Sequence, residues 1–271
     1  MMLKNHVALV TGASVGLGRA MAFALADAGA CVALASPQTS LLEDAAAQIN
    51  ARCGERRAIA VTTDITQRGD CERARDATLQ AFGDISILVN NARREQRGPG
   101  LPVEGNNFAF WESDPDIWMQ AVNVNVSGTF LMTRTIAPHL IARGWGRIVN
   151  ISTSLDTMQR RHNSPYGVTK AALDAASLIW AADLEGSGVS VNILLPGGMV
   201  DTDGTRPSSA QRKTLHVDVM NAALLWLASP QSDGHSGERY NASRWRADLA
   251  PGDAALGALE PPVLRKPEPR G

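Results

Sequence analysis

Residues 7–18 read Val7-Ala8-Leu9-Val10-Thr11-Gly12-Ala13-Ser14-Val15-Gly16-Leu17-Gly18, and this stretch decides the fold. It starts with a short apolar run that predicts a buried strand, and its glycine-rich turn opens an alanine-rich helix over residues 19–28. Glycines permit positive φ and let a pyrophosphate approach the backbone, while the helix N-terminus supplies unpaired amides. A tight packing turn is the alternative, but the position between strand and helix favours dinucleotide binding. The predicted cofactor contacts in this turn are Gly12, Ser14, Gly16, Leu17 and Gly18.

The alternation of strand and helix continues along the whole chain. Further apolar strands are predicted at 31–35, 58–62, 85–89, 147–151, 189–195 and 238–242, and further helices at 41–51, 71–82, 118–142, 166–184 and 217–228. Strands that are apolar on both faces predict an α/β fold, a Rossmann-type doubly wound parallel sheet with helices on both faces. We expect a single dinucleotide-binding domain over residues 1–245. A proline-rich C-terminal tail is predicted over residues 246–271, either mobile or lying on a neighbouring subunit.

In such a sheet, ligands bind beyond the carboxyl ends of the strands. Polar and glycine residues follow the predicted strands at those ends: Gly12, Ser36, Asp64, Asn91, Thr153 and Pro196. The stretch 93–116 also follows a strand end, and it is rich in glycine, proline, asparagine and charge. That composition is typical of a functional lid or of a disordered loop.

The overall composition excludes several function classes. The chain has 271 residues, of which 44% are hydrophobic and 20% charged, and its formal net charge is −1. This charge predicts no nucleic-acid partner and no anionic membrane surface, and no run reaches the ~20 apolar residues of a membrane span. The three cysteines, Cys31, Cys53 and Cys71, have no metal-ligand or disulfide spacing. We therefore expect a cytoplasmic protein without a bound metal.

Two strand ends concern the adenosine half of a dinucleotide. An acid often binds the adenosine ribose at the end of the second strand, but this chain has Ser36-Pro37 there. Without a carboxylate, a 2′-phosphate meets no repulsion, which weakly favours NADP (NADPH) over NAD; no arginine follows Ser36 to strengthen the preference. Asp64 and Ile65, after the third strand, are placed to contact the adenine. The alternative for Asp64 is a helix N-cap.

Tyr166 and Lys170 lie four residues apart at the start of a predicted helix, and therefore on the same helix face. A free tyrosine ionises near pH ~10, but a nearby positive charge favours the phenolate and lowers that pKa. The pair could thus exchange protons near neutral pH. The alternative is an amphipathic helix with a lysine that reaches solvent.

Together with these features, the order of motifs resembles the short-chain dehydrogenase/reductase (SDR) family over residues 4–228. The motifs are Thr11-Gly12-Ala13-Ser14-Val15-Gly16-Leu17-Gly18, Asn90-Asn91-Ala92, Asn123-Val124-Asn125-Val126-Ser127-Gly128, Gly146-Arg147-Ile148-Val149-Asn150-Ile151-Ser152-Thr153-Ser154, Tyr166-Gly167-Val168-Thr169-Lys170 and Pro196-Gly197. The resemblance implies an NAD(P)-dependent oxidoreductase that transfers hydride between nicotinamide and a carbonyl or alcohol substrate.

The resemblance also implies roles for individual residues. Tyr166 is the general acid/base, Lys170 bonds the nicotinamide ribose, and Asn125 holds a water that links Lys170 to solvent. Additional cofactor contacts are implied at Asn91, Ala92, Pro196, Gly197 and Thr202. By the same resemblance we expect a homodimer or homotetramer.

This sequence departs from the family pattern at two positions. Spacing to Tyr166 places the catalytic hydroxyl at Thr153, whose methyl group restricts χ1, whereas a shift of one residue places it at Ser154. The less hindered Ser154 is slightly favoured, and both stay open. Arg93 stands where the motif usually has glycine, and it either turns outward or reaches a cofactor phosphate or an anionic substrate. These departures weakly favour an alternative function, a nucleotide-binding sensor or scaffold without turnover, which the intact Tyr166–Lys170 pair disfavours.

Overall fold

The computed structural model describes residues 1–94, 109–202 and 214–264. Within these residues the strands form one sheet in the order β3-β2-β1-β4-β5-β6-β7-β8. Their bounds are β1 (Val7–Thr11), β2 (Cys31–Ser36), β3 (Ala58–Thr62), β4 (Ile87–Asn90), β5 (Gly146–Ile151), β6 (Val189–Leu195), β7 (Arg239–Asn241) and β8 (Leu259–Glu260). Strands β1 to β7 pair in parallel, and β8 pairs antiparallel to β7. The predicted α/β fold with a doubly wound, mostly parallel sheet is confirmed.

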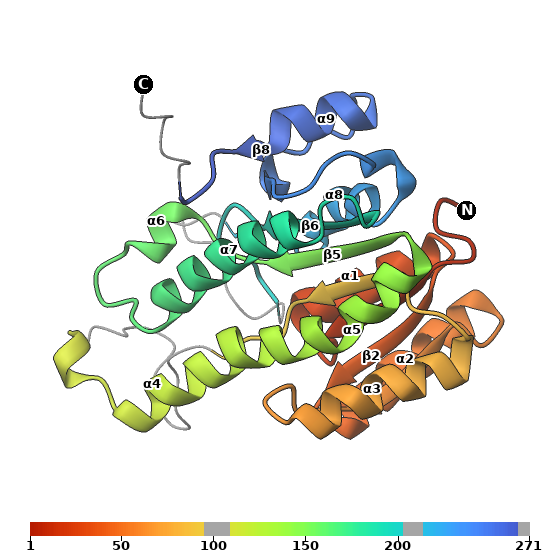
Figure 1. Cartoon of the computed structure of the whole chain (residues 1–271), viewed down its shortest axis with the longest axis horizontal. Helices are drawn as coiled ribbons and strands as arrows, with labels where there is room; N and C mark the ends of the chain where they lie inside the picture. The colour runs from red at the N-terminus through yellow and green to blue at the C-terminus, as the bar shows by residue number, and fades with distance from the viewer. Residues whose placement is uncertain (95–108, 203–213, 265–271) are drawn as a thin grey trace.

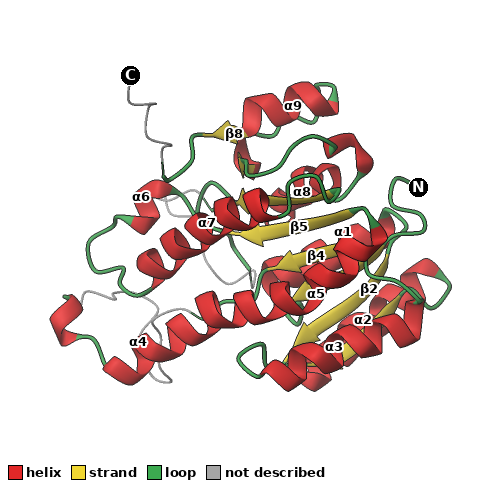
Figure 2. Ribbon diagram, in the orientation of Figure 1, coloured by secondary structure: helices red, strands yellow, loops and turns green. Residues whose placement is uncertain are grey.

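Helices cover both faces of this sheet (Figure 1). Their bounds are α1 (Gly16–Asp27), α2 (Thr39–Cys53), α3 (Arg68–Phe82), α4 (Pro115–Val122), α5 (Thr129–Arg143), α6 (Leu155–Met158), α7 (Tyr166–Asp183), α8 (Asn221–Leu227) and α9 (Pro251–Ala258). Helices α1, α2, α8 and α9 pack against one face, whereas α3 and α5 pack against the other. The view in Figure 2 separates the strands, in yellow, from the helices in front of and behind them.

The two faces have separate hydrophobic cores because successive strand residues point to opposite sides of a sheet. In β1, Ala8 and Val10 belong to one core and Leu9 to the other, and all three are fully buried. This double burial explains why the strands are continuous apolar runs in the sequence. It also leaves the carboxyl ends of the strands as the place where polar side chains can gather.

The strand order reverses direction at β1, which lies between β2 and β4. The chain leaves β1 toward β2 and β3 on one side and returns to β4 on the other. At such a switch point the loops after the two strands diverge and leave a crevice at the carboxyl edge. The glycine turn after β1 and the segment after β4 border this crevice.

The long helix predicted over 118–142 contains an irregular turn. Helices α4 and α5 are joined by a π-helical turn, Asn123–Gly128, which widens the helix by one residue. Within it, the Asn125 carbonyl accepts a hydrogen bond of 3.1 Å from the Thr129 hydroxyl. The predicted range 118–142 is thus helical throughout, and the wider turn within it leaves no mark on the apolar period.

The C-terminal segment also differs from the prediction of a tail. Pro251–Ala258 forms α9, with proline at the start of the helix and Ala254, Ala255 and Ala258 buried. Leu259–Glu260 then forms β8, in which Glu260 pairs with Arg239 and Leu259 with Tyr240 of β7. Residues 265–271 lie outside the described residues, and so do residues 95–108, most of the stretch whose composition fits either a lid or a disordered loop. Among the described helices, none has the length and apolar composition to cross a membrane.

Candidate active site

The glycine turn after β1 is shaped for a close backbone approach. Gly12 and Gly16 have φ of 63° and 57°, in the left-handed region that favours glycine. A Cβ at Gly12 would lie 2.8 Å from the Ala92 Cα, so the turn has no space for a larger residue there. Helix α1 begins at Gly16 without a side-chain cap and without an acidic residue in its first turn. Its unpaired amides and the helix dipole therefore fit a phosphate group.

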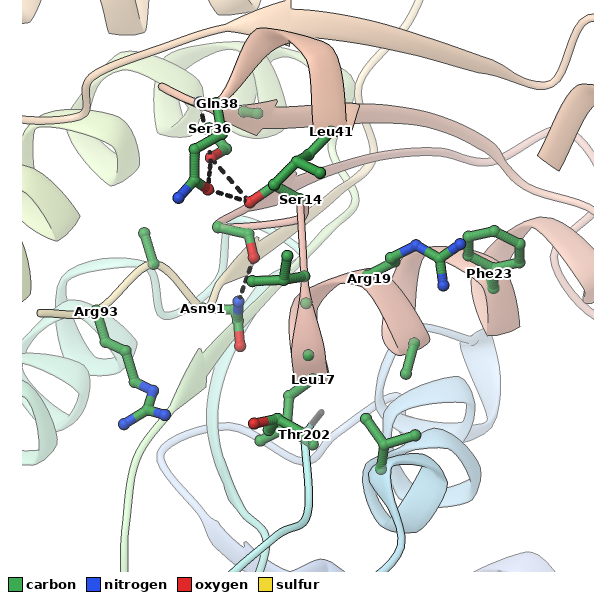
Figure 3. A pocket seen from close by; sticks show the side chains of 18 of the residues that line it. Ser14, Leu17, Arg19, Phe23, Ser36, Gln38, Leu41, Asn91, Arg93 and Thr202 are labelled. Atoms are coloured by element: carbon green, nitrogen blue, oxygen red, sulfur yellow. Dashed lines mark hydrogen bonds between the residues drawn. The ribbon is translucent and has the colours of Figure 1, made fainter. Parts of the chain in front are cut away.

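Asn91 and Thr11 join this turn to the end of β4. The Asn91 side-chain amide donates hydrogen bonds of 3.0 Å to the carbonyls of Thr11 and Gly12. The Thr11 hydroxyl accepts from the backbone amides of Asn91 and Ala92 at 3.0 and 3.1 Å. These bonds fix the two sides of the crevice relative to each other, and Figure 3 shows Asn91 directed toward the turn.

A neutral polar cluster lies at the end of β2, where a dinucleotide fold holds the adenosine ribose. The Ser14 hydroxyl donates to Gln38 Oε1 at 2.5 Å, and the Ser36 hydroxyl lies 3.1 Å from both Ser14 Oγ and Gln38 Oε1. Figure 3 shows the three side chains directed toward one another. Sequence reasoning identified Ser14 and Ser36 but missed Gln38, although its place two residues after the strand was a usable signal.

Asp64 and Ile65 occupy the next strand end. The Asp64 carboxylate accepts from the Thr66 amide at 2.9 Å and from the Thr66 hydroxyl at 2.8 Å, a local turn that precedes α3. The N-cap residue of α3 is Gln67, so Asp64 does not cap the helix itself. Ile65 is buried in the core beneath, and Gly128 packs closely against its side chain.

These strand ends border one cleft of about 1580 Å³. This volume exceeds the ~300–1,000 Å³ of a pocket for a drug-sized ligand. The cleft is lined by these predicted cofactor residues: Gly12, Ser14, Gly16, Leu17, Gly18, Ser36, Asp64, Ile65, Asn91, Ala92 and Thr202. Among the described residues, its lining does not include Tyr166, Lys170, Pro196 or Gly197. The residues present fit a dinucleotide, with its phosphates at α1 and its adenosine at β2.

Arg93 is among the residues that line the cleft (Figure 3). The neighbouring Arg94 is held by Asn125, whose side chain accepts from the Arg94 amide at 2.7 Å and donates to the Arg94 carbonyl at 2.9 Å. Asn125 also donates to the Thr169 hydroxyl at 3.0 Å. The π turn thus places an asparagine that joins the segment after β4 to the helix of Tyr166.

The two candidate hydroxyls after β5 have different surroundings. Ser154 is the N-cap of α6, where its hydroxyl accepts from the Thr157 amide at 3.3 Å and lies 2.8 Å from the Thr157 hydroxyl. Thr153 is 9% exposed, and its hydroxyl has no hydrogen-bond partner within the described part of the chain. The Thr153 hydroxyl is therefore the one of the two that can turn to a ligand without leaving a helix uncapped.

Lys170 is almost completely buried beneath these residues, with 2% of its surface exposed. Its Nζ donates to the Ile151 carbonyl at 2.6 Å, at the end of β5, and lies 5.9 Å from the centre of the Tyr166 ring. Burial and, to a lesser extent, the positive charge of Arg93 lower the pKa of Lys170, the Asp174 carboxylate opposes them, and the net value is about 7. An amine that titrates near neutral pH beside a half-buried phenol can exchange protons at working pH.

The loop after β6 lies beside the glycine turn. Gly197 has a φ of 83°, and the chain beyond it forms a short bridge between Val200 and Leu215. The Thr202 side chain is 3.2 Å from the position of a Cβ on Gly16. Of the predicted residues in this loop, Thr202 therefore lies beside the glycine turn, and residues 203–213 are outside the described residues.

A profile of the short chain dehydrogenase family matches residues 6–213. The chain belongs to the short-chain dehydrogenase/reductase family. As a member of this family it is an oxidoreductase.

This short-chain dehydrogenase/reductase is similar to several characterised proteins. It is 31% identical over 241 residues to the 2,5-dichloro-2,5-cyclohexadiene-1,4-diol dehydrogenase LinX of Sphingobium indicum, covering 85% of this chain and 91% of that protein. It is 31% identical over 238 residues to D-threitol dehydrogenase of Mycolicibacterium smegmatis, covering 84% and 87% of the two chains. The crystal structure of a 3-ketoacyl-(acyl-carrier-protein) reductase from Brucella melitensis in complex with NADH superposes with a TM-score of 0.75 at 28% identity, covering 88% and 96%.

We predict that burial of Lys170 lowers the stability of this enzyme near neutral pH. Its pKa falls from an ordinary value near 10.5 to about 7. As the pH drops from 10.5 to 7, the unfolded chain therefore takes up a proton that the folded protein does not, and the folded state loses stability. Lys170→Met should raise the melting temperature at pH 6 by a few degrees (~2–8 °C), and the gain should shrink toward pH 10. Differential scanning calorimetry from pH 6 to 10 measures both.

The matched control is Lys4→Met, because Lys4 is exposed and its replacement should shift the melting temperature little at any pH. A Lys170→Met variant that melts below the unmodified protein at pH 6 would contradict the prediction.

Proposed function

We propose that this chain is an NAD(P)-dependent oxidoreductase that interconverts a carbonyl and an alcohol, with Tyr166 as the general acid/base. The observation that carries the proposal is the position of Lys170, buried at the end of β5 with its amine 5.9 Å from the Tyr166 ring and its pKa lowered to about 7. A structural lysine has no need of such burial, which is costly for a charged group. The family membership and the cleft along the glycine turn support the same chemistry.

The protein's part in this reaction is to position the substrate and to move a proton. A bound nicotinamide would supply or accept the hydride. Tyr166 donates the proton to the carbonyl oxygen in reduction and takes it back in oxidation. Lys170 favours the phenolate when it is charged, and because it titrates near pH 7 the two groups exchange protons as a coupled pair. The Asn125 side chain bonds both the segment after β4, at Arg94, and α7, at Thr169, and so keeps that segment against the helix that carries Tyr166 and Lys170.

For the hydroxyl that orients the substrate oxygen, we favour Thr153 over Ser154. The Ser154 hydroxyl is occupied at the N-terminus of α6, and a cap of this kind stabilises a helix by about 1 kcal/mol. Thr153 has its hydroxyl available and lies one residue earlier, at the spacing from Tyr166 that the family motif requires. This choice reverses the slight preference drawn from the sequence.

The neutral cluster of Ser14, Ser36 and Gln38 supports a weak preference for NADPH over NADH. A carboxylate at this point would bind a ribose diol and repel a 2′-phosphate, and the cluster offers hydroxyl and amide groups instead. The nearest arginine of the turn, Arg19, is bonded to Gln48 at 2.6 Å and lies over Phe23. Arg19 lines the same cleft but has no hydrogen bond to Ser36 among the described residues, and the preference stays modest.

The assembly and location are also part of the proposal. Exposed apolar residues on α5 and α7, among them Phe130, Ile141, Val168 and Ile179, support a homodimer or homotetramer through these helices. All three cysteines are unpaired, which suits a reducing, cytoplasmic location. The substrate is proposed to be a small carbonyl or alcohol compound.

Tyr166→Phe should lower kcat for carbonyl reduction by about 10²–10⁴-fold, because it removes the proton donor and keeps the ring. The dissociation constant for NADPH, measured by fluorescence titration, should stay within about threefold because the adenosine cluster is untouched. Turnover is followed as NADPH oxidation with a panel of aldehydes, ketones and quinones. Retained activity in the variant would contradict the role of Tyr166, and an unmodified protein that binds NADPH but turns over no compound would favour a sensor.

Thr153→Val and Ser154→Ala form a matched pair that tests the substrate-orienting hydroxyl. Thr153→Val keeps the side-chain volume and removes the hydroxyl, so kcat should fall by about 10²–10³-fold. Ser154→Ala should leave kcat within about threefold and lower the unfolding free energy by about 1 kcal/mol through the lost cap. Steady-state kinetics and denaturant unfolding measure the two effects. The reverse pattern of kcat values would assign the role to Ser154.

Ser36→Asp tests the cofactor preference. The new carboxylate should weaken NADPH binding by about tenfold or more through repulsion of the 2′-phosphate, while NADH binding should be unchanged or tighter. Parallel fluorescence titrations with NADPH and NADH give both dissociation constants, with Ser36→Asn as the uncharged control. Tighter binding of NADH than NADPH by the unmodified protein would overturn the preference.

A further inference from the structure

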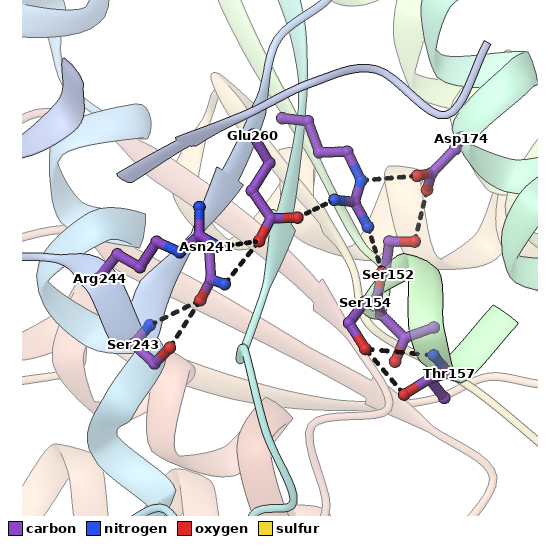
Figure 4. Close-up of polar contacts among 10 residues, drawn as sticks. Ser152, Ser154, Thr157, Asp174, Asn241, Ser243, Arg244 and Glu260 are labelled. Atoms are coloured by element: carbon purple, nitrogen blue, oxygen red, sulfur yellow. Dashed lines mark hydrogen bonds and ion pairs between the residues drawn. The ribbon is translucent and has the colours of Figure 1, made fainter. Parts of the chain in front are cut away.

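A buried arginine connects the C-terminal strand pair to the segment that carries Thr153. Arg239 of β7 is 3% exposed, and its Nε donates to Asp174 Oδ2 of α7 at 2.9 Å. Its other guanidinium nitrogens donate to the Thr153 carbonyl and to the Glu260 carboxylate. One guanidinium thus contacts the end of β5, the helix of Tyr166 and strand β8 at the same time (Figure 4).

The second carboxylate oxygen of Glu260 contacts Asn241 of β7, which lies beside the loop after β6. Its Oε1 accepts from the Asn241 side-chain amide at 2.7 Å. The oxygen of the same Asn241 amide accepts from the Ser243 amide at 3.1 Å and from the Ser243 hydroxyl at 2.8 Å. Gly197 lies directly against Asn241 and Ser243, since a Cβ there would collide with both side chains. Asn241 therefore packs directly against Gly197 in the loop after β6, the loop expected to cover the nicotinamide.

We propose that Glu260 is a positioning residue of the active site, whose two carboxylate oxygens hold the Thr153 segment through Arg239 and the Gly197 segment through Asn241. The proposal rests on the proposed function, because these are the two segments assigned there to the substrate oxygen and the nicotinamide. Glu260 contacts neither ligand itself. The C-terminal segment Pro251–Glu260 is accordingly a part of the catalytic scaffold.

The charges around Arg239 explain why a carboxylate is needed at this point. Arg239 and Lys170 are both buried basic side chains, and Asp174 interacts with both of them. Glu260, with 12% of its side chain exposed, gives Arg239 a second anion. Without it, a buried guanidinium would share one carboxylate with Lys170, and breaking such a buried pair leaves a cation without compensation. The Thr153 carbonyl and the Asp174 carboxylate would then be held by a guanidinium free to shift.

The test compares Glu260→Ala and Glu260→Gln with Arg244→Ala in the full-length protein. Arg244 is a matched control because it also contacts the Glu260 carboxylate, at 3.5 Å, but its side chain is 56% exposed. Glu260→Ala should lower kcat for NADPH-dependent carbonyl reduction by about 10–100-fold through misplaced reacting groups. Glu260→Gln keeps the volume but only one accepting oxygen, so its loss should be smaller. Arg244→Ala should leave kcat within about twofold.

Hydrogen–deuterium exchange provides a readout that does not depend on turnover. In Glu260→Ala, backbone amides of residues 152–157 and of residues 197–200 should both exchange about tenfold faster or more, while α2 (Thr39–Cys53) exchanges as before. The KM for NADPH should change less than about threefold, because the adenosine cluster at β2 is remote from β8.

Three results would overturn the inference. The first is unchanged exchange in both segments, and the second is faster exchange with kcat still within about twofold. The third is a lower melting temperature with normal kcat well below it, which would make Glu260 a residue of stability alone. If the unmodified protein reduces no carbonyl compound, the proposed function fails separately, and the exchange comparison still decides whether Glu260 holds the two segments.

Discussion

The Lys170 amine is buried at the end of β5, and the polar and charged groups at the carboxyl edge of the sheet surround it. A buried ammonium needs hydrogen-bond acceptors and a nearby anion, because desolvation otherwise favours the neutral form. The Ile151 carbonyl supplies an acceptor at 2.6 Å, and Asp174, one helical turn further along α7, supplies the anion. The positive charge of Arg93, which lines the cleft, opposes them because it disfavours the charged form of Lys170. Burial, together with these opposing charges, brings the pKa of Lys170 to about 7, where both protonation states are populated at physiological pH.

The position of that group depends on polar bonds that cross the buried core. The Asn90 side chain at the end of β4 donates to Thr133 of α5 at 2.9 Å and to Asn150 of β5 at 2.8 Å, and Asn150 donates to Ser177 of α7 at 2.8 Å. Such bonds are directional, whereas apolar packing tolerates small sliding of helices over a sheet. This ladder therefore fixes α5 and α7 relative to the strand ends. These hydrogen bonds thereby position Asn125 and Lys170, although the residues that form them do not line the cleft.

The sequence was sufficient for the fold and for the local part of the site. Because each strand is buried on both faces, its sequence is a continuous apolar run. The turn after β1 requires a φ of 63° at residue 12, and the sequence accordingly has glycine there. The π turn at Asn125 was missed, since one wider turn leaves the apolar period unchanged. The composition of Pro251–Glu260 resembles that of a disordered chain and therefore predicts a tail. Its pairing with β7 depends on a partner about twenty positions away, and no local pattern records such a pairing.

The adenosine end of the site is held by local hydrogen bonds, whereas the proposed catalytic end is held by charged contacts between distant segments. Only the local contacts could be predicted from the sequence. At the adenosine end, Ser14, Ser36 and Gln38 come from adjacent strand ends and make neutral hydrogen bonds that each turn provides locally. At the proposed catalytic end, Arg239 joins groups 65 and 86 residues away in the chain, Asp174 and Thr153. The family profile covers residues 6–213, so Arg239, Asn241 and Glu260 all lie beyond it. The carboxylate of Glu260, which pairs with Arg239 beneath Thr153, thus lies outside the residues that the profile matches. The proposed catalytic end depends on contacts between segments far apart in the chain, whereas the cofactor turn is formed by neighbouring residues.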